Sequence, residues 1–277
     1  MKVVIRFSVL ASGSKGNACY VESSGARVLV DAGLSCRELE RRLALNGLSA
    51  ERLDAIILTH EHIDHIRGAG VMARRYSVPV YTTEGTMTAG AARIGKLPRM
   101  VNVRTGGSFV IADMEIEPFT KCHDAADPFA LAISSDGVKL GIATDIGRCT
   151  RLVEDRLRGC SALVMEFNHD PGMLENGPYP LFLKRRISGS EGHLSNGQGA
   201  RLTASLVHEG LDIVVCAHLS ETNNDPRTVY DEARRCLVEA GAGQVKLIVS
   251  DPNTPCPLVE LRCRSKTAVT GTVGTEI

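Results

Sequence analysis

The residue pattern with the clearest chemical meaning is a run at positions 59–65, Thr-His-Glu-His-Ile-Asp-His. Three histidines and one aspartate directly after an apolar stretch are hard to explain by packing alone. A histidine cluster at a strand-to-helix turn is typical of a metal site, because imidazole and carboxylate groups are common ligands of divalent metals. A turn places His60 and His62 toward one ion, whereas Asp64 and His65 open the next helix and point toward a second.

A pair of metal ions needs more ligands than this cluster contains. Two ions in such sites lie roughly 3.5–4 Å apart and need a bridging ligand between them. The chain has only eight histidines, so the choice of further ligands is small. We expect them at the carboxyl ends of separate predicted strands, where side chains from different elements converge: His123, Asp145 and His218.

The elements that position these residues alternate between short apolar strands and amphipathic helices. The predicted strands are 3–10, 18–22, 27–31, 54–59, 78–82, 108–111, 114–120, 129–135, 138–144, 162–167, 212–217 and 244–250. The predicted helices are 36–46, 66–76, 86–94, 151–157, 180–186, 197–209 and 226–240. These strands and helices fall into two comparable halves of the chain, and this division predicts two sheets packed face to face with helices outside. We expect one domain over 1–264 and a disordered tail over 265–277, where Thr, Gly and Val occur without periodicity.

Composition and charge exclude some functions. Lys plus Arg and Asp plus Glu are both 32, which gives a net charge of zero and argues against a general polyanion-coating protein. A nucleic-acid enzyme whose positive field is confined to one cleft stays possible. Aromatic residues make up only 4% and tryptophan is absent, so recognition by many stacked rings is not expected.

The cysteines and the N-terminus indicate the compartment. The nine cysteines are scattered, odd in number and never spaced as C-x-x-C, which predicts free thiols in a reducing environment. Residues 1–10 have no signal-peptide pattern, and no apolar run is long enough to cross a bilayer. We therefore expect a cytoplasmic protein with no membrane contact and no obligate protein partner.

Together these motifs resemble one known family. H-x-H-x-D-H followed by a single His, a single Asp and a late His is the metal-site pattern of the metallo-β-lactamase superfamily. The resemblance is closest to its bacterial WalJ/YycJ subfamily and runs in order from about Phe7 to Leu261. The motifs that carry it are Ser12-Gly-Ser-Lys-Gly-Asn17, Asp31-Ala-Gly-Leu-Ser35, His123-Asp-Ala-Ala-Asp-Pro128, Asn168-His-Asp170, Gly192-His-Leu-Ser-Asn196 and His218-Leu-Ser-Glu-Thr-Asn-Asn224.

This resemblance implies a fold, an activity and a ligand set. The fold would be a four-layer αββα sandwich of the α/β class with the metals at one edge of the sheets. The activity would be that of a DNA exonuclease, with two divalent ions, zinc or manganese by preference and iron as a further option. His60, His62 and His123 would hold the first ion and Asp64, His65 and His218 the second, with Asp145 bridging them.

Two residues are expected to carry catalysis. Two divalent ions lower the pKa of a bridging water from 15.7 toward roughly 7, which makes hydroxide available for attack on a phosphodiester. Asp64 should orient that hydroxide while it ligates. The departing oxygen needs a proton donor, and His193 is the candidate because a comparable extra histidine contacts the scissile phosphate in RNase Z and RNase J. Alternatively, His193 stabilises its glycine-flanked loop.

Substrate contacts are predicted at several polar loops, each with a structural alternative. The loop 12–17 could present N–H groups to a phosphate or form a tight turn between two strands. His169 could contact substrate or orient a ligand, and the basic run 184–186 could bind backbone phosphates or form a solvated helix face. The candidates are Ser12, Ser14, Asn17, His169, Lys184, Arg185, Ser195, Asn196 and Ser220.

Other substrates on the same scaffold remain open alternatives, because the ligand motif does not separate them. These are a thioester or lactone, a small cyclic nucleotide, or no substrate at all in a metal-bearing regulatory module. The stretch between Asp145 and His193 is too short for the inserted domain of RNase J, and no protruding arm of the RNase Z type is visible. A compact enzyme that acts on DNA ends or single strands is therefore favoured.

Overall fold

The computed structural model describes residues 2–263, in which fourteen strands form two seven-stranded sheets. The predicted tail 265–277 lies outside these residues. The first sheet has the spatial order β14 (Val259–Arg262), β1 (Val3–Ala11), β2 (Ala18–Glu22), β3 (Arg27–Val30), β4 (Ala55–Ile57), β5 (Val80–Thr82) and β6 (Met100–Asn102). The second has the order β13 (Lys246–Val249), β12 (Ile213–Ala217), β11 (Ala162–Glu166), β10 (Val138–Ala143), β9 (Phe129–Ser135), β8 (Met114–Thr120) and β7 (Phe109–Ile111).

Each sheet changes from antiparallel to parallel pairing partway across. Pairing is antiparallel from β14 to β3 and parallel from β3 to β6, and the second sheet repeats this with antiparallel β7 to β10 and parallel β10 to β13. Parallel strands need crossover connections, and helices provide most of them. Because the carboxyl ends of parallel strands lie at the same edge, the loops that follow them meet there.

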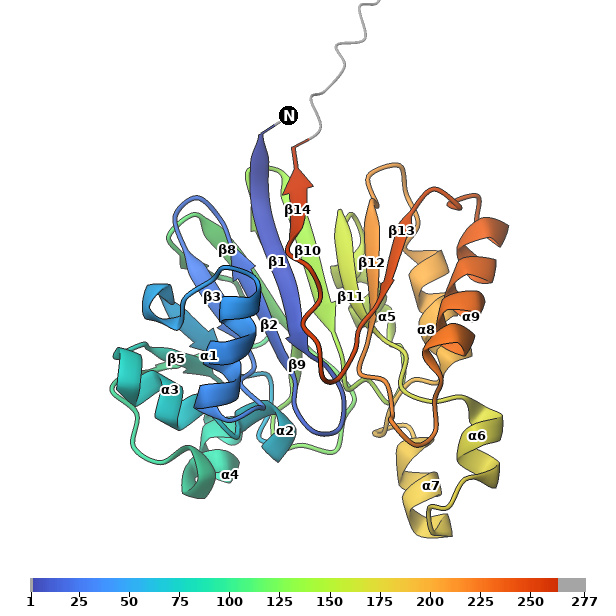
Figure 1. The fold of residues 1–277 in the computed structure, drawn as a ribbon, viewed down its shortest axis with the longest axis horizontal. Coiled ribbons are helices and arrows are strands. Elements are labelled where there is room, and N and C mark those ends of the chain that lie inside the picture. The colour runs from blue at the N-terminus through green and yellow to red at the C-terminus, as the bar shows by residue number, and fades with distance from the viewer. Residues whose placement is uncertain (1, 264–277) are drawn as a thin grey trace, which may run out of the picture.

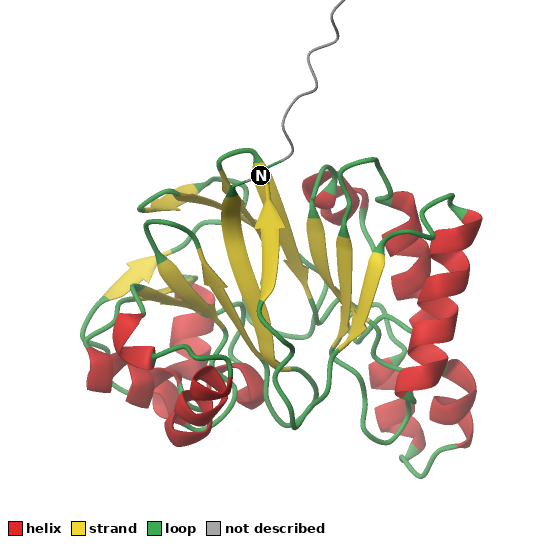
Figure 2. Cartoon of the chain, turned by 45° about the horizontal axis from the view of Figure 1, so that its top comes forward, coloured by secondary structure: helices red, strands yellow, loops and turns green. Residues whose placement is uncertain are grey.

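Helices cover the outer faces of the sheets, so the αββα layering predicted from the sequence is confirmed (Figures 1 and 2). Beside the first sheet lie α1 (Cys36–Leu45), η1 (Ala50–Arg52), α2 (Ile63–Ile66), α3 (Ala69–Tyr76) and α4 (Glu84–Ile94). The second half contains α5 (Arg151–Leu157), α6 (Pro171–Asn176), α7 (Leu181–Ile187), α8 (Asn196–Ser205) and α9 (Pro226–Glu239). Figure 1 shows α6 and α7 extending beyond α8 and α9 at one end of the molecule.

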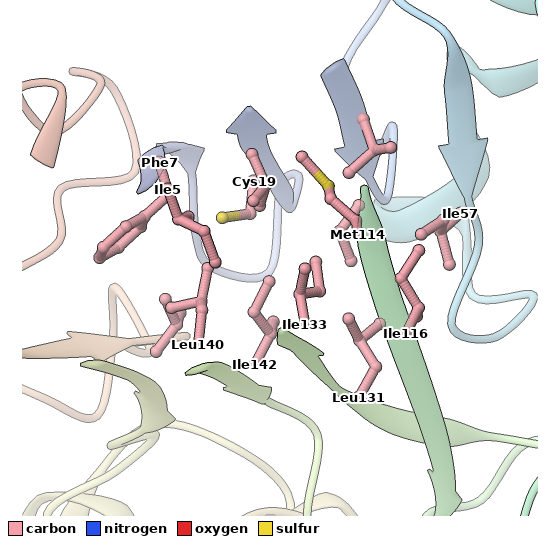
Figure 3. Packing of buried hydrophobic residues seen from close by; sticks show 14 of the residues in the cluster. Ile5, Phe7, Cys19, Ile57, Met114, Ile116, Leu131, Ile133, Leu140 and Ile142 are labelled. Carbon is pink, nitrogen blue, oxygen red and sulfur yellow. The ribbon is translucent and has the colours of Figure 1, made fainter. Parts of the chain in front are cut away.

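The core between the sheets is made by their inward-facing apolar side chains. Figure 3 shows Ile5 and Phe7 of β1 above Leu140 and Ile142 of β10, and all of these side chains are buried in one cluster. Two further clusters join the helices to the outer faces of the two sheets. All five residues of β11 are buried, as expected for a parallel strand covered on both faces.

The main difference from the sequence prediction is the helix expected over 66–76. It is divided into α2 and α3, and the break contains Gly68. The Gly68 N–H donates to Ala32 O at 2.8 Å, and a Cβ at this position would lie 2.2 Å from Leu34 O. The backbone therefore approaches the β3–α1 loop too closely for any side chain, which holds α2 against the end of β3.

Short elements at 50–52, 100–102, 171–176 and 259–262 were not predicted. The nine cysteines, which all lie within 2–263, form no disulfide with one another; six are buried, and Cys149 is exposed. Within 2–263, the helices are too short or too polar to span a lipid bilayer.

Candidate metal centre

The seven predicted ligands converge at the edge where the strand-ending loops meet. His60 and His62 follow β4, Asp64 and His65 lie in α2, and the others follow β8, β10 and β12. We call His60, His62 and His123 the first triad, and Asp64, His65 and His218 the second triad. Within each triad the potential ligand atoms all lie within 4.8 Å of one another.

Asp145 lies between the two triads. Its Oδ2 is 3.3 Å from His65 Nε2, and its Oδ1 is 3.4 Å from His218 Nε2 and 3.8 Å from His123 Nε2. The side chain is 2% exposed. One carboxylate is thus within reach of both groups, which is the arrangement that a ligand shared by two cations requires.

Unpartnered buried atoms indicate that cations fit here. His60 Nε2, Asp145 Oδ2 and His218 Nε2 are buried and have no hydrogen-bond partner among residues 2–263. Buried polar atoms are nearly always paired. Three such atoms that converge on one space form a nitrogen and oxygen donor set suited to divalent metals, so the residues present fit the metal ions that the ligand pattern implies.

In the first triad, hydrogen bonds orient the imidazole rings. Thr59 Oγ1 lies 3.0 Å from His60 Nδ1, and Gly192 O accepts from His123 Nδ1 at 3.2 Å. These contacts leave Nε2 of both rings for a cation. His62 is turned the other way, because its Nε2 lies 3.2 Å from Asp124 O and its Nδ1 lies 3.2 Å from His123 Nε2.

In the second triad, two buried carboxylates orient the rings. Asp31, after β3, accepts a hydrogen bond from His65 Nδ1 at 2.8 Å. Glu166, the last residue of β11, accepts one from His218 Nδ1 at 2.8 Å. A carboxylate on Nδ1 fixes the tautomer that presents the Nε2 lone pair and makes the ring a better metal donor.

Glu166 was missed by the sequence analysis, although it is fully buried. It also accepts hydrogen bonds from His193 Nδ1 at 2.9 Å and from the N–H groups of Asp145, Ile146 and Leu194 at 3.1, 2.9 and 3.0 Å. Its signal in the sequence is the single charge at the end of an otherwise apolar strand, two residues before Asn168.

Three residues at this edge have an unusual backbone conformation. Asp31, Asp145 and His218 have φ values of 59°, 57° and 59°, in the left-handed region that side chains other than glycine rarely adopt. Asp31 and His218 directly follow a strand, and Asp145 lies two residues beyond the end of β10. Such backbone strain persists only where the surrounding contacts over-determine it, and it is concentrated at functional sites.

The two triads differ in charge. Burial lowers the pKa of His60 well below its ordinary value and that of His123 to about 4, so these rings are neutral. Burial opposes charge on His65 as well, but Asp145, Asp31 and Asp64 together raise its pKa to about 10. Carboxylates thus surround the second triad and favour a positive charge there, whereas the first triad offers neutral imidazoles.

Asn17 and Ser12 support ligands rather than face an open cavity. Asn17 Nδ2 donates to Asp64 Oδ2 at 3.1 Å, and Ser12 Oγ accepts from the His218 N–H at 2.6 Å. The N–H groups of Gly13, Gly16 and Asn17 are bonded to Asn17 Oδ1, Gly13 O and Asp64 O. The geometry of loop 12–17 therefore favours the tight-turn alternative over a phosphate-binding loop.

Other predicted substrate residues have internal partners. Ser195 caps α8 in a reciprocal capping box with Gln198, and Asn196 is hydrogen-bonded to Asn224 at 2.8 Å. Ser220 Oγ accepts from Asn223 N at 3.1 Å. The structure does not bring His169, Lys184 and Arg185 to the triads, because they line a separate cavity on the other side of α7.

A cavity of about 250 Å³ opens onto the triads. His193, 20% exposed, lines it, and the Glu166 contact at Nδ1 leaves Nε2 as the nitrogen on the cavity side. Arg186 lines it as well and donates from Nε to Asp124 Oδ2 at 2.5 Å. The full lining is Ser14, His62, Asp64, Asp145, Asn168, Tyr179, Leu183, Arg186, Ile187, His193, His218 and Ser220.

The site thus groups two candidate ligand triads beside a cavity that is also lined by the His193 imidazole and the Arg186 guanidinium. Arg186 belongs to the basic run 184–186 that the sequence predicts to contact phosphates, but only Lys184 and Arg185 were named as individual candidates. The signal that distinguishes them is helical phase, since 183, 186 and 187 share one face of α7.

Comparison with known proteins identifies the family. The family described as "Beta-lactamase superfamily domain" matches residues 26–215. The chain is 37% identical to Exodeoxyribonuclease YycJ of Bacillus anthracis over 91% of this chain and 97% of that protein. It is 34% identical to Exodeoxyribonuclease WalJ of Streptococcus pneumoniae over 94% of this chain and 99% of that protein.

Solved structures show the same fold at low identity. The metallo-β-lactamase fold protein YhfI from Bacillus subtilis superposes with a TM-score of 0.70 at 16% identity, over 92% of this chain and 99% of that one. A diphosphatase of the PhnP family gives a TM-score of 0.66 at 16% identity, over 93% and 98% of the two chains. The chain therefore belongs to the beta-lactamase superfamily, as a hydrolase similar over nearly its whole length to the YycJ and WalJ proteins.

Proposed function

We propose that this protein is a dinuclear metal-dependent phosphodiesterase that degrades DNA from its ends. The observation that carries the proposal is the position of Asp145 between two triads beside an open cavity. The names of the two relatives, both exodeoxyribonucleases, support the substrate. The nitrogen-rich first triad and the carboxylate-containing second triad suit zinc or manganese.

The metals would be held by the first triad, by the second triad and by Asp145 between them. When bound, two divalent cations supply Lewis acidity and lower the pKa of a water molecule toward neutrality. Asp64 lines the cavity with a side chain that is 17% exposed, more than that of the other carboxylate ligand Asp145, and Asn17 holds its Oδ2 at 3.1 Å. Its role is to orient the attacking water and accept its hydrogen bond.

His193 is proposed to protonate the leaving oxygen. In its charged form the ring donates from Nδ1 to Glu166 and keeps a second proton on Nε2, on the cavity side. Its position beside the triads, at 4.0 Å from Asp145 Oδ1, leaves the ring free of the proposed ligand set. A donor so placed is typically worth about 10²–10⁴ in rate.

Arg186 is proposed to bind a non-bridging oxygen of the scissile phosphate. It is more than half exposed and is tied to Asp124, whose Oδ1 is 3.8 Å from His62 Nε2. A guanidinium offers several donors, so the contact with Asp124 does not use up its capacity. The Arg186 guanidinium thus lies at the mouth of the cavity, and its contact with Asp124 fixes its position relative to the first triad.

The test is a gel assay with the metal-loaded protein and end-labelled single- and double-stranded DNA and RNA, with a small thioester in parallel. Wild type should shorten DNA progressively, and Asp64→Ala should abolish the reaction. Asp155→Ala, which changes an exposed aspartate on α5, is the matched control. Cleavage of no polymer, with turnover of the thioester or of small nucleotides, would leave the metal centre in place and overturn the substrate.

A further inference from the structure

A second cavity, of about 340 Å³, lies on the other side of α7 from the metal centre. It is within the size range of small-molecule sites. Residues 181, 184 and 185 of α7 and the C-cap residue Ser188 line it, a spacing of i, i+3, i+4 and i+7 that defines one helix face. Residues 183, 186 and 187 line the cavity of the metal centre, so α7 is a wall shared by the two cavities.

The end of β11 joins the cavities as well. Asn168 lines the metal-centre cavity and donates from Nδ2 to His218 O at 3.0 Å. The next residue, His169, lines the second cavity. The consecutive side chains of Asn168 and His169 therefore reach different cavities, and α7 separates the two cavities.

The lining of the second cavity combines apolar walls with cations. Pro171 and Leu174 of α6 face Leu181 of α7, and Lys184 and Arg185 lie beside them. Lys184 Nζ donates to Glu175 O at 2.7 Å, which links the two helices. Glu175 is the one carboxylate among the described lining residues, whereas Arg185 is exposed and has no side-chain partner within 2–263.

His169 is the polar group without a structural explanation. It is 3% exposed, and its Nδ1 is buried with no hydrogen-bond partner in the described part of the chain. Burial lowers its pKa to about 4, so the ring is neutral. A neutral imidazole can donate one hydrogen bond and accept another, which matches the mixed edge of a heterocyclic base rather than an anion alone.

We propose that this cavity binds a nucleotide, with the base between the apolar walls of α6 and α7, its edge near His169 and its phosphate at Arg185. The inference deepens the proposed nuclease function and rests on it. Because the cavities share α7, the nucleotide bound here would be one close to the scissile phosphate in the same strand. A released mononucleotide has the same chemistry, and the experiment separates the two sources.

Binding is measured by fluorescence anisotropy with single-stranded oligonucleotides whose phosphorothioate linkages resist cleavage. A single abasic site is moved along the strand from its end. In wild type we expect a loss of affinity of about tenfold at one position only, because removal of roughly 60 Å² of apolar surface from water is worth a factor of that order. The same series is then repeated with Leu181→Asp, which places a charge in the apolar wall.

Leu181→Asp should weaken binding of the intact strand by a similar factor and should abolish the dependence on the abasic position, because the two changes remove the same contact. Val238→Asp is the matched control, since Val238 and Leu181 are 57% and 62% exposed and Val238 lies on α9. Arg185→Gln should weaken binding of a strand and of free deoxyadenosine monophosphate alike.

A positional loss assigns the cavity to a nucleotide of the strand. Binding of free mononucleotide that depends on Leu181, without a positional loss, assigns it to the released product. Absence of both effects overturns the nucleotide site while the gel assay still tests the nuclease. Nucleotide binding that depends on Leu181 in a protein that cleaves no polymer would overturn the nuclease and retain the site.

Discussion

Asp31 and Glu166, one from each sheet, both accept a hydrogen bond from a histidine of the second triad, but they differ in how many other groups they bind. Asp31, beyond β3, accepts from Thr59 N and Oγ1 and from His65 Nδ1 at 2.8–2.9 Å. Glu166, at the end of β11, accepts from three backbone N–H groups and two imidazoles. The first carboxylate orients one short segment, whereas the second joins three separate loops.

The difference follows from how each sheet supplies its ligands. The first sheet delivers four of them from the single run 60–65, which needs little help to stay together. The second delivers His123, Asp145 and His218 one at a time from the ends of different strands. Where ligands are distant in sequence, one buried acceptor shared by the Asp145, His193 and His218 loops replaces the continuity of the chain, and the His193 loop in turn holds His123 through Gly192 O.

The largest expected effect is that of Glu166→Ala compared with Asp31→Ala. Loss of Glu166 leaves five donors unpaired, and we expect it to lower the free energy of unfolding by about 3–5 kcal/mol and to abolish turnover. Asp31→Ala should cost less, about 2–3 kcal/mol, because fewer donors lose their partner. Urea unfolding of both variants checks the order. A larger loss for Asp31→Ala would contradict the comparison.

The two histidines that share Glu166 should behave differently when removed. His218→Ala deletes a member of the second triad, so bound metal measured by elemental analysis should fall. His193→Ala should keep the metal content of wild type and lower kcat by about 10²–10⁴ through loss of the proton donor. A His193→Ala enzyme at near-normal rate would remove His193 from the reaction.

A moderate effect is expected for Ser12→Ala, at a contact between the two halves. Ser12 lies in the loop after β1, and its hydroxyl accepts the His218 N–H. The substitution leaves that buried N–H unpaired at a cost of about 1–3 kcal/mol. Thermal unfolding should show a lower Tm, with retained metal. The matched substitution Ser14→Ala, in the same loop, should leave the Tm within a degree or two of wild type.

The smallest effect is expected for Glu38, a partly exposed carboxylate on α1 that is remote from the metal centre in the sequence. Hydrogen bonds from Arg41 and Arg42 outweigh burial and lower the pKa of Glu38 from 4.5 to about 2. Because the folded-state pKa is depressed, Glu38 adds stability above pH 4.5, and this contribution is lost as the pH falls through about 2. Glu38→Gln should cost at most about 1 kcal/mol at pH 7, because Glu38 is partly exposed to solvent.

Urea unfolding of Glu38→Gln and wild type at neutral and strongly acidic pH checks this expectation. The difference between the two proteins should shrink on acidification. A difference that grows instead would mean that Glu38 acts through packing rather than through its charge.

Four of the seven candidate ligands could be foreseen because their pattern is local: His60, His62, Asp64 and His65 lie within six positions. The strand ends at His123, Asp145 and His218 could be found because histidines are few. Glu166 could not, since its partners are 20–52 residues away and a single glutamate gives no periodic signal. Its role exists only once β10, β11 and β12 lie side by side.

The sequence also did not reveal which residue of the basic run 184–186 faces the metal centre. The basic run 184–186 lies in a helix that the sequence predicts correctly, yet only Arg186 faces the metal centre. Which residue of three faces inward depends on the rotation of α7 about its axis, and contacts with α6 and loop 188–193 decide that. The break at Gly68 is similar, because its cause is Leu34 O, a contact across the fold.

The left-handed backbone at Asp145 sets a limit on laboratory evolution. Glycine at this position would relieve the backbone strain and would remove a buried oxygen that has no hydrogen-bond partner within 2–263, so a screen for heat-resistant variants without an activity assay would tend to select it. Such a replacement would delete the carboxylate proposed to lie between the two metal ions. Thermal robustness and the proposed hydrolysis are thus opposed at this codon, and a library that keeps it fixed would search for stability only where it is compatible with function.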